Sequence, residues 1–334
     1  LGVGWSDLAG IVRAGRRSAS GSFRRGPAGR YNDGAMDVLG LTFVTGEGRI
    51  IRTSSRARKS SAGYDLTRLL VGSEGTLGII TEVTLRLYPQ PEAISAATCS
   101  FPTVEAAVRT TIETIQMGVP IARCELLDAL TVKAVNARNK LGLPELPMLL
   151  FEFHGSPTGV AEQVEAVQAI ARGHGAAAFQ WANQPEERSR LWEARHNAYF
   201  ACLQLKPGSR SFTTDVCVPI SRLAECITET IRDTSTSPLP APILGHVGDG
   251  NFHCAILADP GRPEEIEEAE RLNRRIVARA LAMDGTCTGE HGVGMHKMDF
   301  LRDEHGDDAL ELMARIKRSF DPLNILNPGK IVRV

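Results

Sequence analysis

The chain has 334 residues, of which 43% are apolar and 23% charged, and its formal net charge is -1. This composition is ordinary for a globular protein, and the charge excludes a whole-chain attraction to nucleic acid or to an anionic membrane. No apolar run approaches the roughly 20 residues of a membrane span, and the seven cysteines contain no Cys-x-x-Cys pair. A disulfide framework is therefore not expected, and a cytoplasmic location is favoured, with peripheral membrane association left open.

Residues 1–27 differ in composition from the rest of the chain. They are rich in Arg, Gly and Ser, contain Asp7 as their single acid, and show little periodicity. Arg- and Ser-rich, acid-poor leaders are typical of transit peptides, which would indicate a mitochondrial location in a eukaryote. Because the segment lacks a periodic apolar pattern, we favour an atypical, disordered leader.

Between residues 28 and 91 the pattern predicts a small unit rich in strands. Two apolar runs flank a Thr-Gly-Glu-Gly turn, so a hairpin is expected over Val38–Thr53. A short helix or turn over Tyr64–Val71, a glycine loop over Gly72–Gly78 and a strand over Ile79–Leu87 follow.

The glycine loop repeats Gly72, Gly75 and Gly78 at every third position, directly before a strand. Glycine lets backbone amides approach a ligand closely. The loop matches neither the dinucleotide fingerprint, in which the glycines lie between a strand and a helix, nor a P-loop. It predicts either a ligand-contacting loop or a plain connection. Pro89 and Pro91 then mark a domain boundary.

From residue 92 onward, helical and extended patterns alternate. This mixture favours an α+β domain in which helices cover an antiparallel sheet. Helices are expected over residues 103–116, 159–172, 186–203, 221–232, 263–283 and within 295–320, and strands over 148–154, 176–181 and 211–218.

Residues 246–253 read His-Val-Gly-Asp-Gly-Asn-Phe-His, which places His246 and His253 at the two ends of a turn between strands. Such a turn lets both imidazoles point at one spot. Glu290 and His291 follow in a second glycine-bounded segment. Two histidines and a carboxylate are a common ligand set for a catalytic divalent metal, and a further histidine could act as a general base. The alternative is a pair of structural histidines in an ordinary hairpin.

Four runs, residues 60–82, 246–253, 289–294 and 327–330, resemble in this order the FAD-linked 2-hydroxy acid dehydrogenases (FAD-binding oxidase/transferase type 4). The resemblance is strongest to cytochrome-linked members that oxidise D-lactate, with members that oxidise glycolate or D-2-hydroxyglutarate close by. It implies the C-terminal part of an FAD-binding PCMH-type domain over residues 28–91. An α+β substrate domain with an antiparallel sheet and a helical C-terminal segment is implied over residues 92–334.

The resemblance also implies cofactors and roles. FAD and a divalent metal, Zn or Mn, would serve the oxidation of D-lactate or a similar small D-2-hydroxy acid to the 2-oxo acid, with the hydride passing to flavin N5. The metal ligands would be His246, His253 and Glu290, and the base His291. The substrate would contact Arg195, Tyr199 and Thr213, and the flavin Glu74, Gly75, Gly78, Ile80 and Asn327.

The implied partners are the hydroxy acid and an electron acceptor, which is a cytochrome, a quinone or another flavoprotein; no nucleic acid is expected, and a homodimer is one option. Position 213 carries no Lys or Arg, which favours a small hydroxy acid over a dicarboxylate. Two alternatives remain at this point. One is a metal-dependent hydrolase that uses the same His/His/Glu set. The other is an inactive truncated fragment, because the pyrophosphate-cradling loop of the family precedes the matching part.

Overall fold

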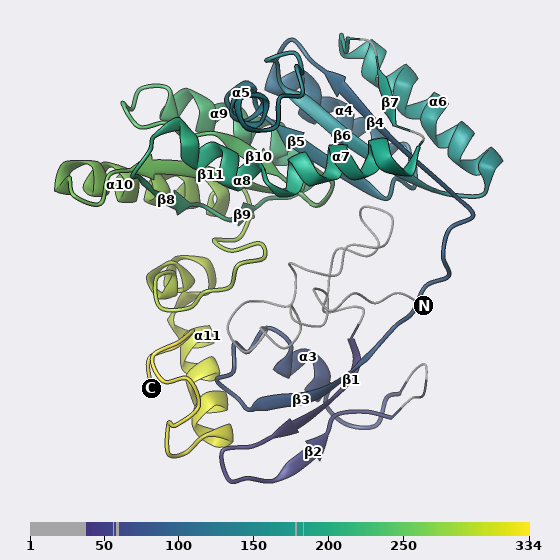
Figure 1. Ribbon diagram of the computed structural model, residues 1–334. Helices are drawn as coiled ribbons and strands as arrows, with labels where there is room; N and C mark the ends of the chain where they lie inside the picture. The colour runs from purple at the N-terminus through teal and green to yellow at the C-terminus, as the bar shows by residue number, and fades with distance from the viewer. Residues whose placement is uncertain (1–37, 56, 58–59, 178, 183) are drawn as a thin grey trace. The chain divides into compact units, whose positions relative to one another are not determined.

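The structure is a computed structural model that describes residues 38–334 apart from 56, 58, 59, 178 and 183. Within the described residues the chain forms two compact units (Figure 1), which we call unit 1 (residues 38–89 and 287–334) and unit 2 (residues 90–286). The expected leader over residues 1–27 lies outside the described residues.

Unit 1 is built on a small antiparallel sheet. Its elements are β1 (Val38–Val44), β2 (Ile50–Arg52), α3 (Leu66–Leu70), β3 (Ile79–Leu85) and α11 (Met298–Phe320). The strand order is β2-β1-β3, which confirms the predicted hairpin and the strand after the glycine loop. Phe43, Leu70 and Leu77 form the core, and Phe320 of α11 packs against it. The long helix α11 bends at Gly306, where φ is 78°.

Unit 2 is built on an eight-stranded antiparallel sheet. Its strands are β4 (Ala93–Ser100), β5 (Arg123–Leu127), β6 (Met148–Gly155), β7 (Gln180–Ala182), β8 (Arg210–Thr213), β9 (Val216–Cys217), β10 (Ile243–Gly245) and β11 (Asn251–Ala258). The order is β7-β4-β6-β5-β10-β11-β8, and β9 also pairs with β11. Every recorded pairing is antiparallel, so the predicted α+β class is confirmed.

Two groups of helices cover the two faces of this sheet (Figure 1). The helices are α4 (Val104–Gln116), α5 (Ala129–Asn139), α6 (Pro157–Gly173), α7 (Pro185–His196), α8 (Ala198–Cys202), α9 (Leu223–Thr234) and α10 (Pro263–Leu281), and short 3-10 turns lie at Leu203–Leu205, Ile220–Arg222 and Val247–Asp249. On β5, Cys124 contacts Thr111 of α4, whereas Leu127 packs with residues of α5 and α8. Because successive strand residues point to opposite faces, α4 and the pair α5 and α8 lie on opposite sides of the sheet.

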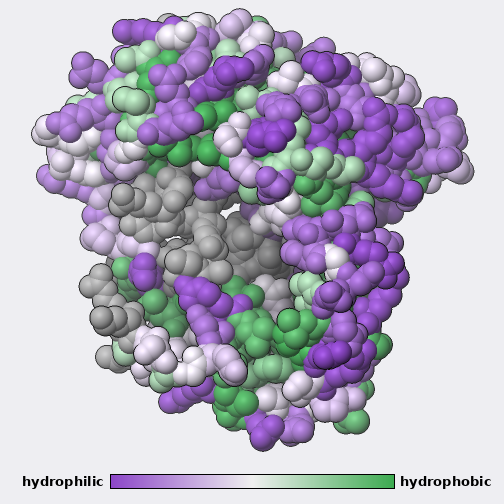
Figure 2. Space-filling view, turned by 180° about the vertical axis from the view of Figure 1, so that it is seen from behind, coloured by the Kyte–Doolittle hydropathy of each residue, from purple (hydrophilic) through white to green (hydrophobic). Residues whose placement is uncertain are grey.

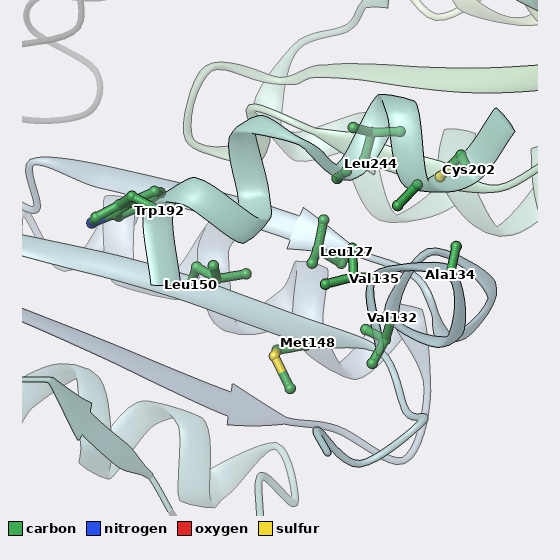
Figure 3. Packing of buried hydrophobic residues seen from close by; sticks show 11 residues of the cluster. Leu127, Val132, Ala134, Val135, Met148, Leu150, Trp192, Cys202 and Leu244 are labelled. Atoms are coloured by element: carbon green, nitrogen blue, oxygen red, sulfur yellow. The ribbon is translucent and has the colours of Figure 1, made fainter. Parts of the chain in front are cut away.

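One apolar cluster fills the space between the sheet and α5, α7 and α8 (Figure 3). Leu127, Met148, Leu150 and Leu244 enter it from the strands, and Trp192 enters it from α7. On the other side, α10 buries residues such as Leu272 and Ile276 and exposes a hydrophilic surface (Figure 2). Among the described helices, none combines the length and apolarity that crossing a bilayer requires.

Three differences from the sequence prediction have local causes. The strands β4 and β5 and the helix α5 were not predicted, because α5 shows no apolar face that its sequence alone would reveal. The predicted strand over 211–218 is interrupted at Thr214 and Asp215, and the predicted helix over 186–203 divides at Asn197.

Candidate functional site

The two predicted metal-binding histidines lie on the hairpin that connects β10 and β11. His246 follows the last residue of β10, and His253 lies on β11 in register with Leu244. Gly250 closes the turn with φ at 80°, and a Cβ there would lie 2.2 Å from the carbonyl oxygen of Val218, so only glycine fits. The ring centroids of the two histidines are 5.7 Å apart with the planes at 85°.

Each of these imidazoles directs Nδ1 at an oxygen acceptor. Nδ1 of His246 lies 2.8 Å from Oε1 of Glu125, and Nδ1 of His253 lies 3.2 Å from the carbonyl oxygen of Thr214 and 3.6 Å from Oδ1 of Asp215. Carbonyl and carboxylate oxygens accept hydrogen bonds, so Nδ1 is the donor in both rings, and in a neutral ring Nε2 then carries the lone pair. Metal-binding histidines in proteins have this arrangement.

Glu125 also contacts the predicted substrate residue. Nη2 of Arg195, in the last turn of α7, donates to Oε2 of Glu125 at 2.7 Å, and both side chains are buried. The Nε of Arg195 is buried without a hydrogen-bond partner among the described residues. One carboxylate therefore joins His246 to Arg195. Glu125 was not predicted as a site residue; the available signal was an acid inside the apolar run Cys124–Leu127.

Asp215 is the second residue that sequence analysis missed. It is fully buried at the break between β8 and β9, and Nδ2 of Asn251 donates to its Oδ1 at 3.0 Å. The backbone N–H of Cys254 donates to the hydroxyl of Thr214 at 2.9 Å. The interruption of the strand thus turns polar groups toward β11, and the signal for it was Thr-Thr-Asp in an otherwise apolar strand pattern.

The other predicted substrate residues have more exposed positions in unit 2. Tyr199, on α8, is 38% exposed, and its ring meets that of Phe200 edge to face. Thr213 is half-buried at the end of β8, pairs with Ala255, and shares a hydrogen bond with the hydroxyl of Ser211. Arg210, the first residue of β8, is exposed.

The predicted third ligand and base belong to unit 1. Glu290 is half-buried and His291 is exposed, and Nε2 of His291 lies 3.6 Å from Oε1 of Glu290. The backbone after them is held by Glu74, whose carboxylate accepts hydrogen bonds from the N–H groups of Val293 and Gly294 at 2.6 and 2.8 Å. The four predicted metal and base residues are thus divided between the units, His246 and His253 being in unit 2.

The predicted flavin contacts surround the glycine loop of unit 1. Glu74 is buried with φ at 51°, and its carbonyl oxygen accepts a hydrogen bond from the side-chain amide of Asn327. Gly75 has φ at 73°. Gly78 has a packing role, since a Cβ there would lie 2.6 Å from Cδ2 of Phe43, and Ile80 packs against the core of the unit.

Thiol chemistry is not supported at this site. All seven cysteines are free. Burial raises the pKa of Cys217, which lies beside the hairpin, to about 11, and burial also raises the pKa of Cys254, the neighbour of His253. At neutral pH both remain thiols, which are poor nucleophiles and poor metal ligands.

Comparisons with known proteins identify the family of the chain. The model of the family "FAD linked oxidases, C-terminal domain" matches residues 90–331. The chain is 49% identical to "Probable D-lactate dehydrogenase, mitochondrial" of Danio rerio, over 95% of this chain and 64% of that protein. It is 48% identical to "D-lactate dehydrogenase [cytochrome], mitochondrial" of Arabidopsis thaliana, over 91% and 53%. The chain thus spans somewhat more than half the length of these curated relatives.

A solved structure supports the fold. The 4-ethylphenol oxidase from Gulosibacter chungangensis, in its isoeugenol complex, aligns with a TM-score of 0.72 at 16% identity, covering 97% of this chain and 69% of that one. Likeness at this identity concerns the fold alone. The family match, which covers all of unit 2 and residues 287–331 of unit 1, establishes that the chain belongs to the FAD-linked oxidases, the family that the motifs indicated.

Proposed function

We propose that this chain carries the substrate and metal residues of an FAD-dependent dehydrogenase that oxidises D-lactate or a similar small D-2-hydroxy acid to the 2-oxo acid. The contact that carries the proposal is the bridge from His246 through Glu125 to Arg195. A 2-hydroxy acid bears its hydroxyl on the carbon next to its carboxylate. A metal-binding histidine and a carboxylate-binding arginine held by one side chain suit that short separation.

In unit 2, His246 and His253 are proposed to hold a divalent metal. His246 and His253 both present Nε2 as the nitrogen with the lone pair, and imidazole is a ligand that Zn and Mn accept. Glu290 is proposed as the third ligand from the motif it shares with the family. The glycine loop of unit 1 is proposed to contact FAD, and a Cβ at Gly72 would meet no described residue within 4 Å, so the backbone there is open to close approach.

The reaction assigns one task to each residue. Arg195 binds the substrate carboxylate, with Tyr199 and Thr213 beside it, and His291 takes the proton from the 2-hydroxyl. When bound, FAD accepts the hydride from the α-carbon and the metal lowers the pKa of the hydroxyl. Glu74, Gly75, Gly78, Ile80 and Asn327 are proposed to form the part of the flavin site that this chain supplies.

The names of the relatives support two further proposals. The cytochrome designation of the Arabidopsis thaliana relative favours a cytochrome as the electron acceptor over a quinone or another flavoprotein. The mitochondrial designation of both relatives favours that location if the source is eukaryotic. Membership of an oxidase family argues against the metal-dependent hydrolase.

The test incubates the chain with excess FAD and Zn or Mn, removes unbound FAD by desalting, and then measures reduction of the retained flavin by added substrate. We expect retained flavin absorbance that bleaches with D-lactate faster than with glycolate or D-2-hydroxyglutarate. His291→Ala should slow the bleaching by at least about 10²-fold, since a general base contributes about that much. His296→Ala, a change at an exposed histidine five residues away, is the matched control.

Three outcomes would oppose the proposal. Retained flavin that D-lactate does not bleach would refute the dehydrogenase. Flavin that is not retained at all would support the inactive fragment. A preference for the dicarboxylate would refute the small substrate.

A further inference from the structure

We propose that Glu125 is a positioning residue that sets the separation between the metal-binding histidine and the substrate-binding arginine. Its two oxygens have different partners: Oε1 faces Nδ1 of His246 at 2.8 Å and Oε2 accepts from Nη2 of Arg195 at 2.7 Å. This inference rests on the proposed function for the roles of those two partners.

The position of Glu125 in the sheet is unfavourable for a carboxylate. It lies on the face of β5 that also carries Leu127, and its cross-strand partner on β6 is Leu150. Both leucines belong to the apolar cluster beneath α5, α7 and α8 (Figure 3). Glu125 is only 4% exposed, and a buried carboxylate is destabilising unless it is paired and hydrogen-bonded. The charge is therefore retained together with its two partners, both of which belong to the predicted site.

The contacts give Glu125 two effects on the site. Because a carboxylate only accepts hydrogen bonds, it holds the proton of His246 on Nδ1 and makes Nε2 the basic, metal-binding nitrogen. It also engages one N–H of Arg195 and fixes the plane of the guanidinium, which has five N–H groups in total. Since a carboxylate is rigid and planar, it holds the ring and the guanidinium in a fixed relation, as binding the adjacent hydroxyl and carboxylate of a 2-hydroxy acid would require.

The same sheet face contains a matched control. Glu152, on β6, is buried, lies 2.7 Å from Nε2 of His154, and lies 3.7 Å from Nε of Arg123. It therefore also joins a histidine to an arginine, but neither of its partners is a proposed site residue. Glu152→Gln removes a buried carboxylate of the same kind without touching His246 or Arg195.

The experiment measures Zn binding to the full chain by titration calorimetry and the KM and kcat for D-lactate after reconstitution with FAD. We expect Glu125→Gln to raise the Zn dissociation constant by about 10- to 100-fold, the range for partners that orient metal ligands. KM should rise more than kcat falls, because Arg195 loses its alignment. Glu152→Gln should change neither quantity while lowering thermal stability to a similar extent.

Glu125→Asp covers the case in which Glu125→Gln does not fold. It keeps the charge, but its side chain is one methylene too short to reach both partners, so folded Glu125→Asp should show the same weakened Zn binding and raised KM. The inference would be overturned if either folded variant had the wild-type Zn dissociation constant and the wild-type KM for D-lactate. A wild-type chain that binds Zn but does not oxidise D-lactate, with Zn binding weakened by Glu125→Gln, would refute the proposed function and leave the positioning of His246 supported. A wild-type chain that binds no Zn would refute both.

Discussion

Glu125 in unit 2 and Glu74 in unit 1 are both buried carboxylates with 4% exposure, and their partners differ in kind. Glu125 contacts the side chain of His246, which follows β10, and the side chain of Arg195 on α7. Glu74 accepts hydrogen bonds from the backbone N–H groups of Val293 and Gly294. Burial alone therefore does not distinguish a carboxylate that orients ligand-binding side chains from one that holds a loop.

The chemistry of the partners does separate them. A side chain held by Glu125 can still bind something else, because an imidazole and a guanidinium each have further nitrogens. A backbone amide held by Glu74 has no second hydrogen, so these hydrogen bonds fix the path of the 293–294 loop and leave no further donor on those amides for a ligand. We infer that the buried charges of unit 1 mainly stabilise its fold, whereas Glu125 orients groups that bind ligands.

The largest expected effect concerns the buried ion pair of Lys317 and Asp321 in unit 1. Nζ of Lys317 donates to the carbonyl oxygens of Thr76 and Leu326 at 3.0 and 2.8 Å and to the carboxylate of Asp321. Lys317→Met leaves that carboxylate buried and unpaired, which should lower the free energy of unfolding by about 3–5 kcal/mol. Urea unfolding at pH 7 measures the loss, and Zn binding by unit 2 residues should be unchanged.

Two controls sharpen this prediction. Arg318→Met changes the exposed neighbour of Lys317 and should alter stability by no more than about 0.5 kcal/mol. Burial alone would raise the pKa of Asp321, but Lys317 and two backbone amides hold it below 3.8. The contribution of this pair is therefore present above pH 3.8 and is lost as the pH falls below that value. A loss that persists undiminished at lower pH would contradict the ion pair as its cause.

Glu74→Gln should have the next largest effect. The amide keeps one acceptor oxygen, so one of the two charge-assisted hydrogen bonds to the 293–294 backbone is lost, which should lower stability by about 1.5–3 kcal/mol. Glu82→Gln, at an exposed carboxylate that accepts from Thr42, is the control and should have a much smaller effect. Hydrogen exchange at Gly294 should accelerate. If Glu74→Gln weakened Zn binding as strongly as Glu125→Gln, the distinction between the two carboxylates would fail.

The parts of the fold predicted from sequence are those with local signals. The hairpin over Val38–Thr53 and the turn between His246 and His253 were recognised because turn residues interrupt apolar runs. The long helices α6 and α10 were recognised because their apolar residues recur at helical spacing. Family motifs then supplied the FAD-linked oxidase assignment, which the family model confirms.

The contacts that organise the site have no local signal. Glu125 is 121 residues from His246, and they meet only because β5 pairs with β10 in the middle of the sheet. Asp215 reaches His253 only because the strand breaks before β9. A periodic pattern marks which face of a strand is buried, but it does not identify the neighbouring strand. Contacts that depend on the order of the strands in the sheet could therefore be identified only in the structure.

Asp128 offers the smallest effect and a third kind of buried acid. It precedes α5 in unit 2, and its carboxylate accepts a hydrogen bond from the N–H of Thr131 at 2.7 Å. No Lys or Arg of the described chain forms an ion pair with it. Burial raises its pKa from 3.8 to about 6 although the hydrogen bonds to Thr131 oppose this. The folded state therefore holds the proton more tightly than the unfolded state, and stability should fall as the pH rises from 3.8 to about 6.

Asp128→Asn should remove this fall, because an amide oxygen still caps the helix and carries no charge to bury. At pH 7 we expect the variant to be more stable than the wild type by on the order of 1 kcal/mol, and to lose that advantage below pH 3.8.

Asp65→Asn is the control: Asp65 caps α3 at the surface, and the backbone N–H and guanidinium of Arg68 lower its pKa. Its contribution is present above pH 3.8 and is lost below, so Asp65→Asn should slightly destabilise at pH 7. Unfolding curves between pH 3 and 7 measure the change in stability of both variants, which should be a gain for Asp128→Asn and a loss for Asp65→Asn at pH 7. A buried acid without a cation would thus weaken the fold at neutral pH, whereas the buried carboxylate of Glu125 has the guanidinium of Arg195 beside it.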